Sequence, residues 1–279
     1  MLQDPTCTTN WFARETLPLR IPNARTLTAI ADMHHVDTSF LRRLRARDEQ
    51  AWFDLWEAFG PVVRGTLHRW GNGRIGEETL RDLTQDTLAA LSGSIDRFDP
   101  TRGVRFSTWL LSIAKHVLGD EFDRRNAQKR GAGKRNTSLD ETWMGASREP
   151  QPDEEYERRV LAAKVHSAIR ATQKRAEFVH FEAYRMRVLD SKSGREIGLL
   201  VGVSEPTVTR HCQRVRELLR DELAIAIEQW SFTDDERVEP RDAGLAGDDT
   251  LFDEAVGEIW REQEDLMARD HARWQEGHA

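Results

Sequence analysis

The 279-residue chain contains no run of about 18 apolar residues, so no segment is long enough to span a membrane as a helix. Its first residues lack the charged and then apolar pattern of a secretory signal peptide. The only two cysteines, Cys7 and Cys212, lie far apart and suggest neither a disulfide framework nor a metal site. We therefore expect a cytoplasmic protein with no membrane partner.

The sequence also lacks the patterns that carry enzyme chemistry. It contains no pairing of a nucleophile with a base, no cluster of metal ligands and no glycine-rich phosphate loop, and we interpret His34 and His35 as surface residues. Strand-like alternation is missing too, whereas apolar residues recur at three- and four-residue steps. The sequence predicts an all-α protein with no catalytic residue, no bound metal and no cofactor.

Charge is distributed unevenly along the chain. The net charge is −7, which alone would argue against a nucleic-acid partner. Residues 231–279, however, carry fifteen Asp and Glu against five Arg, so the rest of the chain has a small positive balance in which arginines cluster. This is the pattern of a mildly basic body followed by an acidic extension.

Proline, glycine and polar runs divide the chain into segments. One break is predicted at Gly60-Pro61, between a helix that ends there and a helix over 62–70. Residues 126–156 are polar and rich in Gly, Ser and Pro, which is typical of a flexible linker. The predicted organisation is a leader at 1–36, a helical domain at 37–126, a linker at 127–156, a second helical domain at 157–230 and the acidic extension at 231–279.

Residues 80–96 have the periodicity of an amphipathic helix. Asp82, Gln85, Asp86 and Ala89 fall on the face opposite the apolar arc. Like charges one turn apart, as Asp82 and Asp86 are, slightly destabilise an isolated helix. Their face is either an ordinary solvated surface or an acidic docking surface for a basic partner. The apolar arc consists of Leu80, Leu83, Thr87, Leu88, Leu91 and Ile95.

A basic loop over 97–105 leads into a second amphipathic helix, which Ser107 is expected to cap. Basic residues lie off the apolar stripe or at its end, as the neutralisation of phosphates would require. Core packing is the simpler role for Phe106 and Trp109, and stacking on unpaired bases is the alternative. The stripe expected to be buried is Phe106, Trp109, Leu110, Ile113, Val117 and Phe122.

The two helices together resemble region 2 of bacterial RNA polymerase sigma factors of the extracytoplasmic-function (ECF) type. The family motif D-L-x-Q-[DE] is matched by residues 82–86, the R-F-D-P loop by 97–100, and the F-x-x-W-L helix with its Arg-Arg end by 106–125. The resemblance covers about residues 37–130 and implies a helical bundle that binds core RNA polymerase and melts the −10 promoter element.

The resemblance also implies the residues that act. Those implied to bind the clamp of the largest polymerase subunit are Asp82, Leu83, Gln85 and Asp86. Those implied to bind −10 DNA are Arg102, Arg105, Lys115, His116, Arg124 and Arg125. His116 stands where the family usually has Asn, which leaves the base preference at −10 open.

A helix-turn-helix is predicted at 193–223. Ser193 and Glu196 have the spacing of a capping box, and the first helix is expected to point Ile197 and Leu200 inward. Gly202 supplies the turn and Ser204 is expected to cap the second helix. Its buried stripe is predicted as Val208, Cys212, Val215 and Leu219, which makes Cys212 a small core residue rather than a reactive thiol.

This spacing is typical of a DNA-reading motif, whose second helix enters the major groove. A helical hairpin in a bundle that does not bind DNA is the alternative. The stretch 202–208 resembles the G-V-S-x-x-T-V of region 4 of ECF sigma factors, which implies recognition of the −35 element. The residues assigned to it are Arg195, Thr207, Thr209, Arg210, His211, Gln213 and Arg214.

The resemblance implies as partners core RNA polymerase, through its largest-subunit clamp and its second-largest-subunit flap, and promoter DNA. An anti-sigma factor is a further candidate partner. The implied function is that of a transcription initiation factor. An autonomous helix-turn-helix regulator is the main alternative, although it would leave the motifs at 80–125 without a role. An enzyme with a helical accessory domain is the second alternative.

The acidic extension contains apolar residues that hint at one amphipathic helix. It is either a solvated helix with disordered flanks or a regulatory element that folds onto the body or recruits a partner. A two-domain ECF factor does not need such an extension, so the resemblance gives it no role. We hypothesise that its negative charge competes with DNA or polymerase for the basic surfaces.

Overall fold

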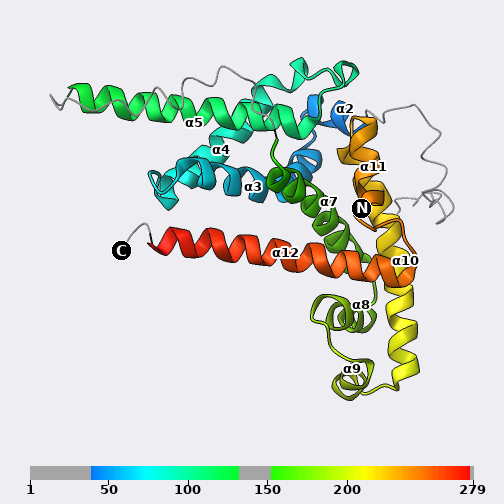
Figure 1. Cartoon of the computed structure of the whole chain (residues 1–279). Helices are drawn as coiled ribbons and strands as arrows, with labels where there is room; N and C mark the ends of the chain where they lie inside the picture. The colour runs from blue at the N-terminus through cyan, green and yellow to red at the C-terminus, as the bar shows by residue number, and fades with distance from the viewer. Residues whose placement is uncertain (1–38, 132–151, 277–279) are drawn as a thin grey trace, which may run out of the picture.

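The computed structural model describes residues 39–131 and 152–276. The predicted leader and most of the predicted linker lie outside these ranges, as does the pair His34 and His35. Every regular element in the described ranges is a helix, which confirms the all-α prediction (Figure 1). None of the described helices is both long and apolar enough to cross a membrane.

The first half of the chain forms a bundle of four α-helices, which we call the N-terminal bundle. Its helix α3 packs against α4, and α4 packs against α5. Two short 3-10 turns, η2 (Ile95–Arg97) and η3 (Pro100–Arg102), shape the loop between α4 and α5. The helices are α2 (Ser39–Arg45), α3 (Glu49–Gly71), α4 (Glu77–Ser94) and α5 (Phe106–Gly131).

Helix α3 runs without interruption through Pro61, so the predicted break at Gly60-Pro61 is wrong. A proline inside a helix removes one backbone hydrogen bond and normally kinks or ends the helix. Here Phe59 and Val62 on either side of it, and Leu67 beyond, are all buried in the same core. We infer that this burial outweighs the cost of the proline.

The second half contains the helix-turn-helix. The second helix of this motif, α10, packs against α7 and α8. The predicted stripe of Val208, Cys212, Val215 and Leu219 is fully buried, which confirms the facing of this helix. The elements are α7 (Glu154–Arg175), α8 (Phe178–Tyr184), the π-helical η4 (Arg185–Leu189), α9 (Gly194–Val201) and α10 (Glu205–Trp230).

The turn between α9 and α10 follows the local sequence closely. Ser193 and Glu196 form the predicted capping box, and Gly202 adopts a left-handed backbone with φ of 75°. Leu200, however, is 65% exposed, so its predicted inward position is wrong. Ile197 fills the inner side of this short helix, and the backbone at Val203 approaches Gly198 so closely that a Cβ there would lie 2.7 Å from the Val203 carbonyl oxygen.

The acidic extension forms two helices, α11 (Asp234–Asp242) and α12 (Asp249–Glu276). Helix α12 contacts α7, η4 and α3, and Figure 1 shows it between the N-terminal bundle and the α8–α9 pair. Of the two interpretations of the extension, the described part therefore fits a segment that folds onto the body.

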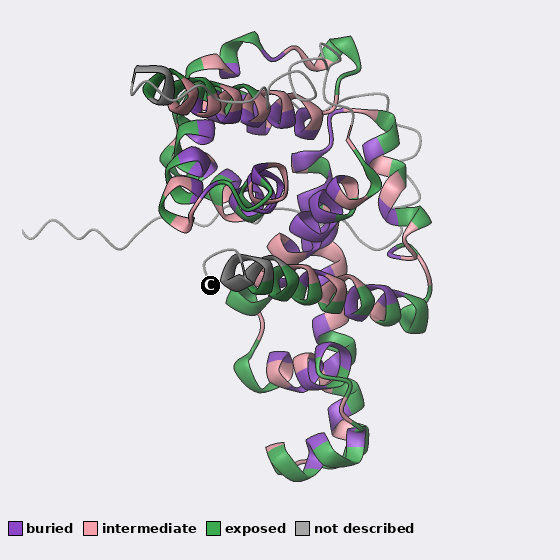
Figure 2. Ribbon diagram, turned by 60° about the vertical axis from the view of Figure 1, so that its left-hand side comes forward, coloured by how far each residue is buried: buried purple, intermediate pink, exposed green. Residues whose placement is uncertain are grey.

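Aromatic contacts join the two halves of the chain. Trp230, at the end of α10, packs edge-on against Phe40 and Phe59 of the N-terminal bundle, with ring centroids 4.3 and 5.1 Å apart. Phe232 packs edge-on against Phe98 and in a tilted arrangement against Phe106. Buried residues accordingly line the inner faces of the helices throughout the molecule (Figure 2). The predicted domain boundaries stay a prediction, but the halves share one core.

Candidate nucleic-acid and partner interface

The exposed face of α4 carries three polar residues predicted to bind polymerase. Asp82, Gln85 and Asp86 are exposed, as the helical wheel predicts, and we call them the acidic face. Leu83, assigned to the same surface, has only 4% of its area exposed and packs into the core. It therefore fixes the orientation of α4, whereas the three polar side chains are free to meet a partner.

A groove runs between α4 and α5 beside the acidic face. It brings together the acidic face, which is predicted to bind polymerase, and Arg124, which is predicted to bind the −10 element. The sequence did not predict that these two sets of residues lie in one groove, because helical periodicity describes each helix separately and not how two helices are placed side by side. The groove is lined by Thr79, Asp82, Leu83, Gln85, Asp86, Val117, Asp120, Glu121 and Arg124.

Glu121 on the floor of this groove orients two arginines. Its side chain is 6% exposed and accepts hydrogen bonds from Arg124 and Arg125, at Nε–O distances of 2.8 and 2.6 Å. Burial alone would raise the Glu121 pKa, but the bonds to Arg125 and Arg124 outweigh it and leave that pKa below its ordinary value. The sequence analysis did not single out Glu121, although its spacing of three and four residues from the arginines is a signal for such a pair.

The inner face of α5 differs from the predicted stripe. Phe106 and Leu110 are buried as predicted, but Trp109, Ile113, Val117 and Phe122 are only partly buried. The helix also begins at Phe106, so Ser107 lies inside its first turn and is not the cap. There the Ser107 carbonyl accepts a 2.6 Å hydrogen bond from the Tyr156 hydroxyl of α7. The positions that complete the buried face are Leu111, Ala114, Leu118 and Glu121.

The middle of α5 presents two residues assigned to −10 DNA. Lys115 is half-buried and His116 is exposed. The His116 Nδ1 lies 2.7 Å from the Ser112 carbonyl oxygen. Because a carbonyl can only accept, Nδ1 is the donor in this contact, and Nε2 is the ring nitrogen left to meet a partner.

The loop before α5 holds its two assigned arginines in different environments. Arg102 is exposed and lies 3.5 Å from Asp99. Arg105 is only 24% exposed and lies 3.3 Å from Glu157 and 4.0 Å from Glu239, so it points into the body. Arg105 therefore does not share a surface with Arg102 in this arrangement.

The DNA-reading surface predicted on the helix-turn-helix is largely open. Arg210, Gln213 and Arg214 are exposed on one side of α10, together with Thr209. Thr207 is half-buried, and Arg195 is exposed on α9. Ser204 occupies the cap position, but its hydroxyl lies 2.9 Å from that of Thr207 and makes no capping bond to the backbone.

His211 is the assigned −35 residue that faces the protein. Its ring stacks on His180 of α8 at a centroid distance of 4.1 Å, and the side chain is half-buried. Burial and the neighbouring His180 lower its pKa. We therefore expect His211 to support the helix-turn-helix rather than contact a phosphate.

The structure also addresses the metal and thiol predictions. Within residues 39–131 and 152–276, no group of three or more His, Cys, Asp or Glu is placed to hold a metal ion. Burial raises the pKa of the Cys212 thiol to about 11, so this thiol is protonated at neutral pH. Cys212 is the core residue that the sequence predicted, and Cys7 lies outside the described residues.

Comparison with known proteins adds two findings. The family profile for sigma-70 region 2 matches residues 55–128, which span most of α3 through α5. The ECF RNA polymerase sigma factor RpoE of Cereibacter sphaeroides is 25% identical over 171 residues, which cover 61% of this chain and 87% of that protein. With the all-α fold, these findings support an ECF sigma factor of the sigma-70 family, a family of promoter-directing transcription initiation factors.

Proposed function

We propose that this chain binds core RNA polymerase through the acidic face of α4, recognises the −35 element with α10 and opens the −10 element with the loop at 97–105 and α5. The observation that carries the proposal is the groove between α4 and α5, which joins the acidic face to Arg124. One groove thus lies beside both the predicted polymerase contact and part of the predicted −10 contact. The printed name of the relative, an RNA polymerase sigma factor, supports the same function.

The acidic face supports a basic polymerase partner. Asp82 and Asp86 are one helical turn apart and exposed, and their mutual repulsion is relieved when a cation lies between them. Exposed charges of this kind contribute little to folding and act mainly in recognition and in the rate of association. The two carboxylates are therefore not needed for the stability of α4 itself, which the buried Leu83 and Leu88 supply.

The exposed face of α10 supports recognition of duplex DNA. Arg210 and Arg214 lie one turn apart near the N-terminal end of the helix, with Gln213 beside them. In helix-turn-helix proteins this end of the second helix reaches base edges in the major groove. An Arg that makes a bidentate bond to guanine contributes about 1–3 kcal/mol of discrimination.

The surface of α5 supports contact with unpaired −10 bases. Arg102 and Arg124 are exposed and can neutralise phosphates. With Nδ1 engaged by Ser112, His116 presents Nε2 outward, and as an acceptor this atom suits the amino group of adenine or cytosine. An Asn side chain at this position would offer both a donor and an acceptor. We therefore propose that His116 narrows the choice of base rather than abolishing contact.

The test is co-elution with core RNA polymerase on a sizing column. The variant Asp82→Lys with Asp86→Lys reverses the acidic face and is expected to lose co-elution. The matched control, Glu228→Lys with Glu254→Lys, makes the same charge change on exposed residues of other helices and should co-elute normally. Normal co-elution of the first variant would refute the surface assignment. If the unaltered chain failed to bind core polymerase yet bound duplex DNA alone, the proposed function itself would be wrong.

A further inference from the structure

The acidic extension holds both halves of the molecule. We use the word latch for residues 233–276, which comprise α11 and α12. Phe252 and Val256 of α12 are completely buried, and Leu245 between the helices is 2% exposed. Removal of apolar side chains from water is the main favourable contribution to folding. The latch is therefore packed as part of the core and is not a loosely attached tail.

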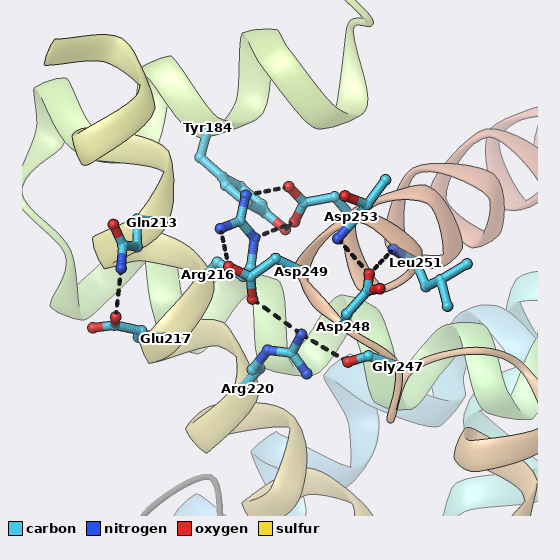
Figure 3. Close-up of polar contacts among 11 residues, drawn as sticks. Tyr184, Gln213, Arg216, Glu217, Arg220, Gly247, Asp248, Asp249, Leu251 and Asp253 are labelled. Carbon is cyan, nitrogen blue, oxygen red and sulfur yellow. Dashed lines mark hydrogen bonds and ion pairs between the residues drawn. The ribbon is translucent and has the colours of Figure 1, made fainter. Parts of the chain in front are cut away.

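The start of α12 is hydrogen-bonded to α10, the helix that carries the proposed −35 surface. Arg216 of α10 donates two hydrogen bonds to Asp253, at 2.9 and 2.6 Å, and a third to Asp249 at 3.0 Å (Figure 3). The Tyr184 hydroxyl donates to the same Asp253 carboxylate at 2.9 Å. The Arg216 side chain is only 14% exposed, and the bidentate bond from it to Asp253 raises its pKa further. Paired bonds of this geometry are among the strongest polar contacts in proteins.

A second arginine of α10 is held in the same region. The Arg220 guanidinium lies 4.1 Å from the centre of the Phe252 ring and donates to the Gly247 carbonyl at 3.0 Å. Its side chain is 13% exposed. The two arginines lie on the same helix as the proposed −35 residues, six and ten residues beyond Arg210. The latch thus covers two positive charges of the helix that carries the −35 surface.

Helix α11 and the later part of α12 contact the first half of the chain and α7. Glu239 of α11 lies 4.0 Å from Arg105, one of the residues assigned to the −10 element, and 4.0 Å from the buried Lys164 of α7. Further along, Glu262 of α12 pairs with Arg158 of α7 at 3.0 Å, and Trp260 stacks on His166 at 4.5 Å. The latch therefore contacts a proposed −10 residue and the −35 helix at the same time.

In this closed arrangement the proposed −35 and −10 residues lie closer together than the two promoter elements do on DNA. Arg210 and Trp230 are separated by about 30 Å of one helix, and Trp230 is embedded in the N-terminal bundle. Even a straight path from Arg210 through Phe232 and along α5 to His116 measures at most about 65 Å. The −35 and −10 positions are 25 base pairs apart, which is about 85 Å of straight duplex. Figure 1 shows that α5 runs sideways and α10 runs downward, so the two helices are not in line and the direct separation is shorter still.

We propose that the latch is an autoinhibitory element that keeps the two DNA-binding surfaces together and must release before the chain can engage a promoter. The inference rests on the proposed function, because it takes the two surfaces to be those for −35 and −10 DNA. Release frees Arg216 and Arg220 near the −35 surface and Arg105 at the −10 surface. It also leaves the aromatic junction of Trp230 and Phe232, which lies outside the latch, as a weakened link between the halves that can then open to span the 25 base pairs.

Two variants open the latch by different means. Asp253→Arg places a positive charge beside Arg216 and removes the bidentate bond. Its matched control is Glu254→Arg, the same charge change on the neighbouring exposed residue. Gly257→Val adds a side chain where a Cβ would lie 2.7 Å from the Val188 carbonyl oxygen, which forces α12 away without any change of charge. Circular dichroism of each variant shows whether its helices are intact.

The experiment measures the radius of gyration of each chain by small-angle X-ray scattering and transcription with core polymerase from a promoter that has both elements. Asp253→Arg and Gly257→Val should have a larger radius than the unaltered chain and Glu254→Arg. At limiting chain concentration they should give at least about fivefold more transcript, the lower range of measured coupling between sites.

Three results would count against this reasoning in distinct ways. An unchanged radius in both variants would overturn the latch as a closing element. A larger radius with unchanged transcription would overturn its inhibitory role. If no chain, the unaltered one included, supported transcription, the proposed function would be wrong, and inhibition of promoter binding would be overturned with it.

Discussion

Replacement of Trp230 by alanine tests whether α10 ends inside the N-terminal bundle. Trp230 is 2% exposed and is the largest fully buried side chain. Its ring packs edge-on against Phe40 and Phe59 at 4.3 and 5.1 Å, and both partners belong to the other half of the chain. The side chain therefore couples two segments that are separated by more than 150 residues in sequence.

The magnitude follows from this burial. Truncation of a buried Trp or Phe to alanine costs about 3–5 kcal/mol, which includes the cavity that is left behind. Edge-to-face aromatic pairs contribute about 0.5–1.5 kcal/mol each to that total. Because domains of this kind have a total stability of about 5–15 kcal/mol, Trp230→Ala should remove about a fifth or more of the free energy of unfolding.

The assay is urea unfolding followed by circular dichroism at 25 °C. We expect a lower midpoint in Trp230→Ala and a broader transition, because the two halves lose a shared contact and unfold less cooperatively. Trp56→Ala is the matched control, since Trp56 is 39% exposed on α3 and should cost less than half as much. If Trp230→Ala lowered the free energy of unfolding by less than about 1 kcal/mol and left its dependence on urea concentration unchanged, the packing of α10 against the bundle would be refuted.

Two further predictions concern DNA recognition and acid stability. Arg210→Ala with Arg214→Ala should lower transcription from a promoter with an intact −35 element by about 5-fold to 150-fold and leave a promoter with a scrambled −35 element unaffected; equal losses on both promoters would contradict base recognition by this pair. Burial and the nearby Arg170 lower the His166 pKa from 6.5 to about 4, so the unfolded chain binds a proton first as the pH falls. Stability linked to His166 is therefore complete above pH 6.5 and should fall by about 2 kcal/mol between pH 7 and pH 5. His166→Phe, which keeps a ring against Trp260, should flatten that part of the pH profile of urea midpoints, and an unchanged profile would argue against a neutral His166.

Features set by neighbours within one or two helical turns were predictable from the sequence. The capping box of Ser193 and Glu196 and the left-handed Gly202 depend on local backbone geometry alone, and the structure has both. The faces of α4 and α10 follow from helical periodicity in the same way, because a single buried stripe fixes the rotation of an amphipathic helix.

Features set by tertiary packing were predicted less well. Pro61 is a local signal for a helix end, but buried side chains on both sides of it favour one helix. Leu200 lies at a position where periodicity favours burial, but the short α9 leaves it exposed beside the turn. In each case the deciding contacts come from residues outside the helical turn that the pattern describes, so no local rule could weigh them.

The latch shows where prediction from charge stops. The sequence gives a strongly acidic extension and a basic body, and it supports the expectation that the two attract each other. It also places Arg216 and Arg220 one turn apart and directly beside the buried stripe of α10, a position where an arginine needs an acidic partner. Periodicity could therefore have identified these two arginines as paired. It could not single out Asp253 among fifteen carboxylates, because that choice depends on how Phe252 and Val256 seat α12 against its neighbours. Apolar burial thus determines which of the available charges meet, and electrostatics determines how firmly they are held.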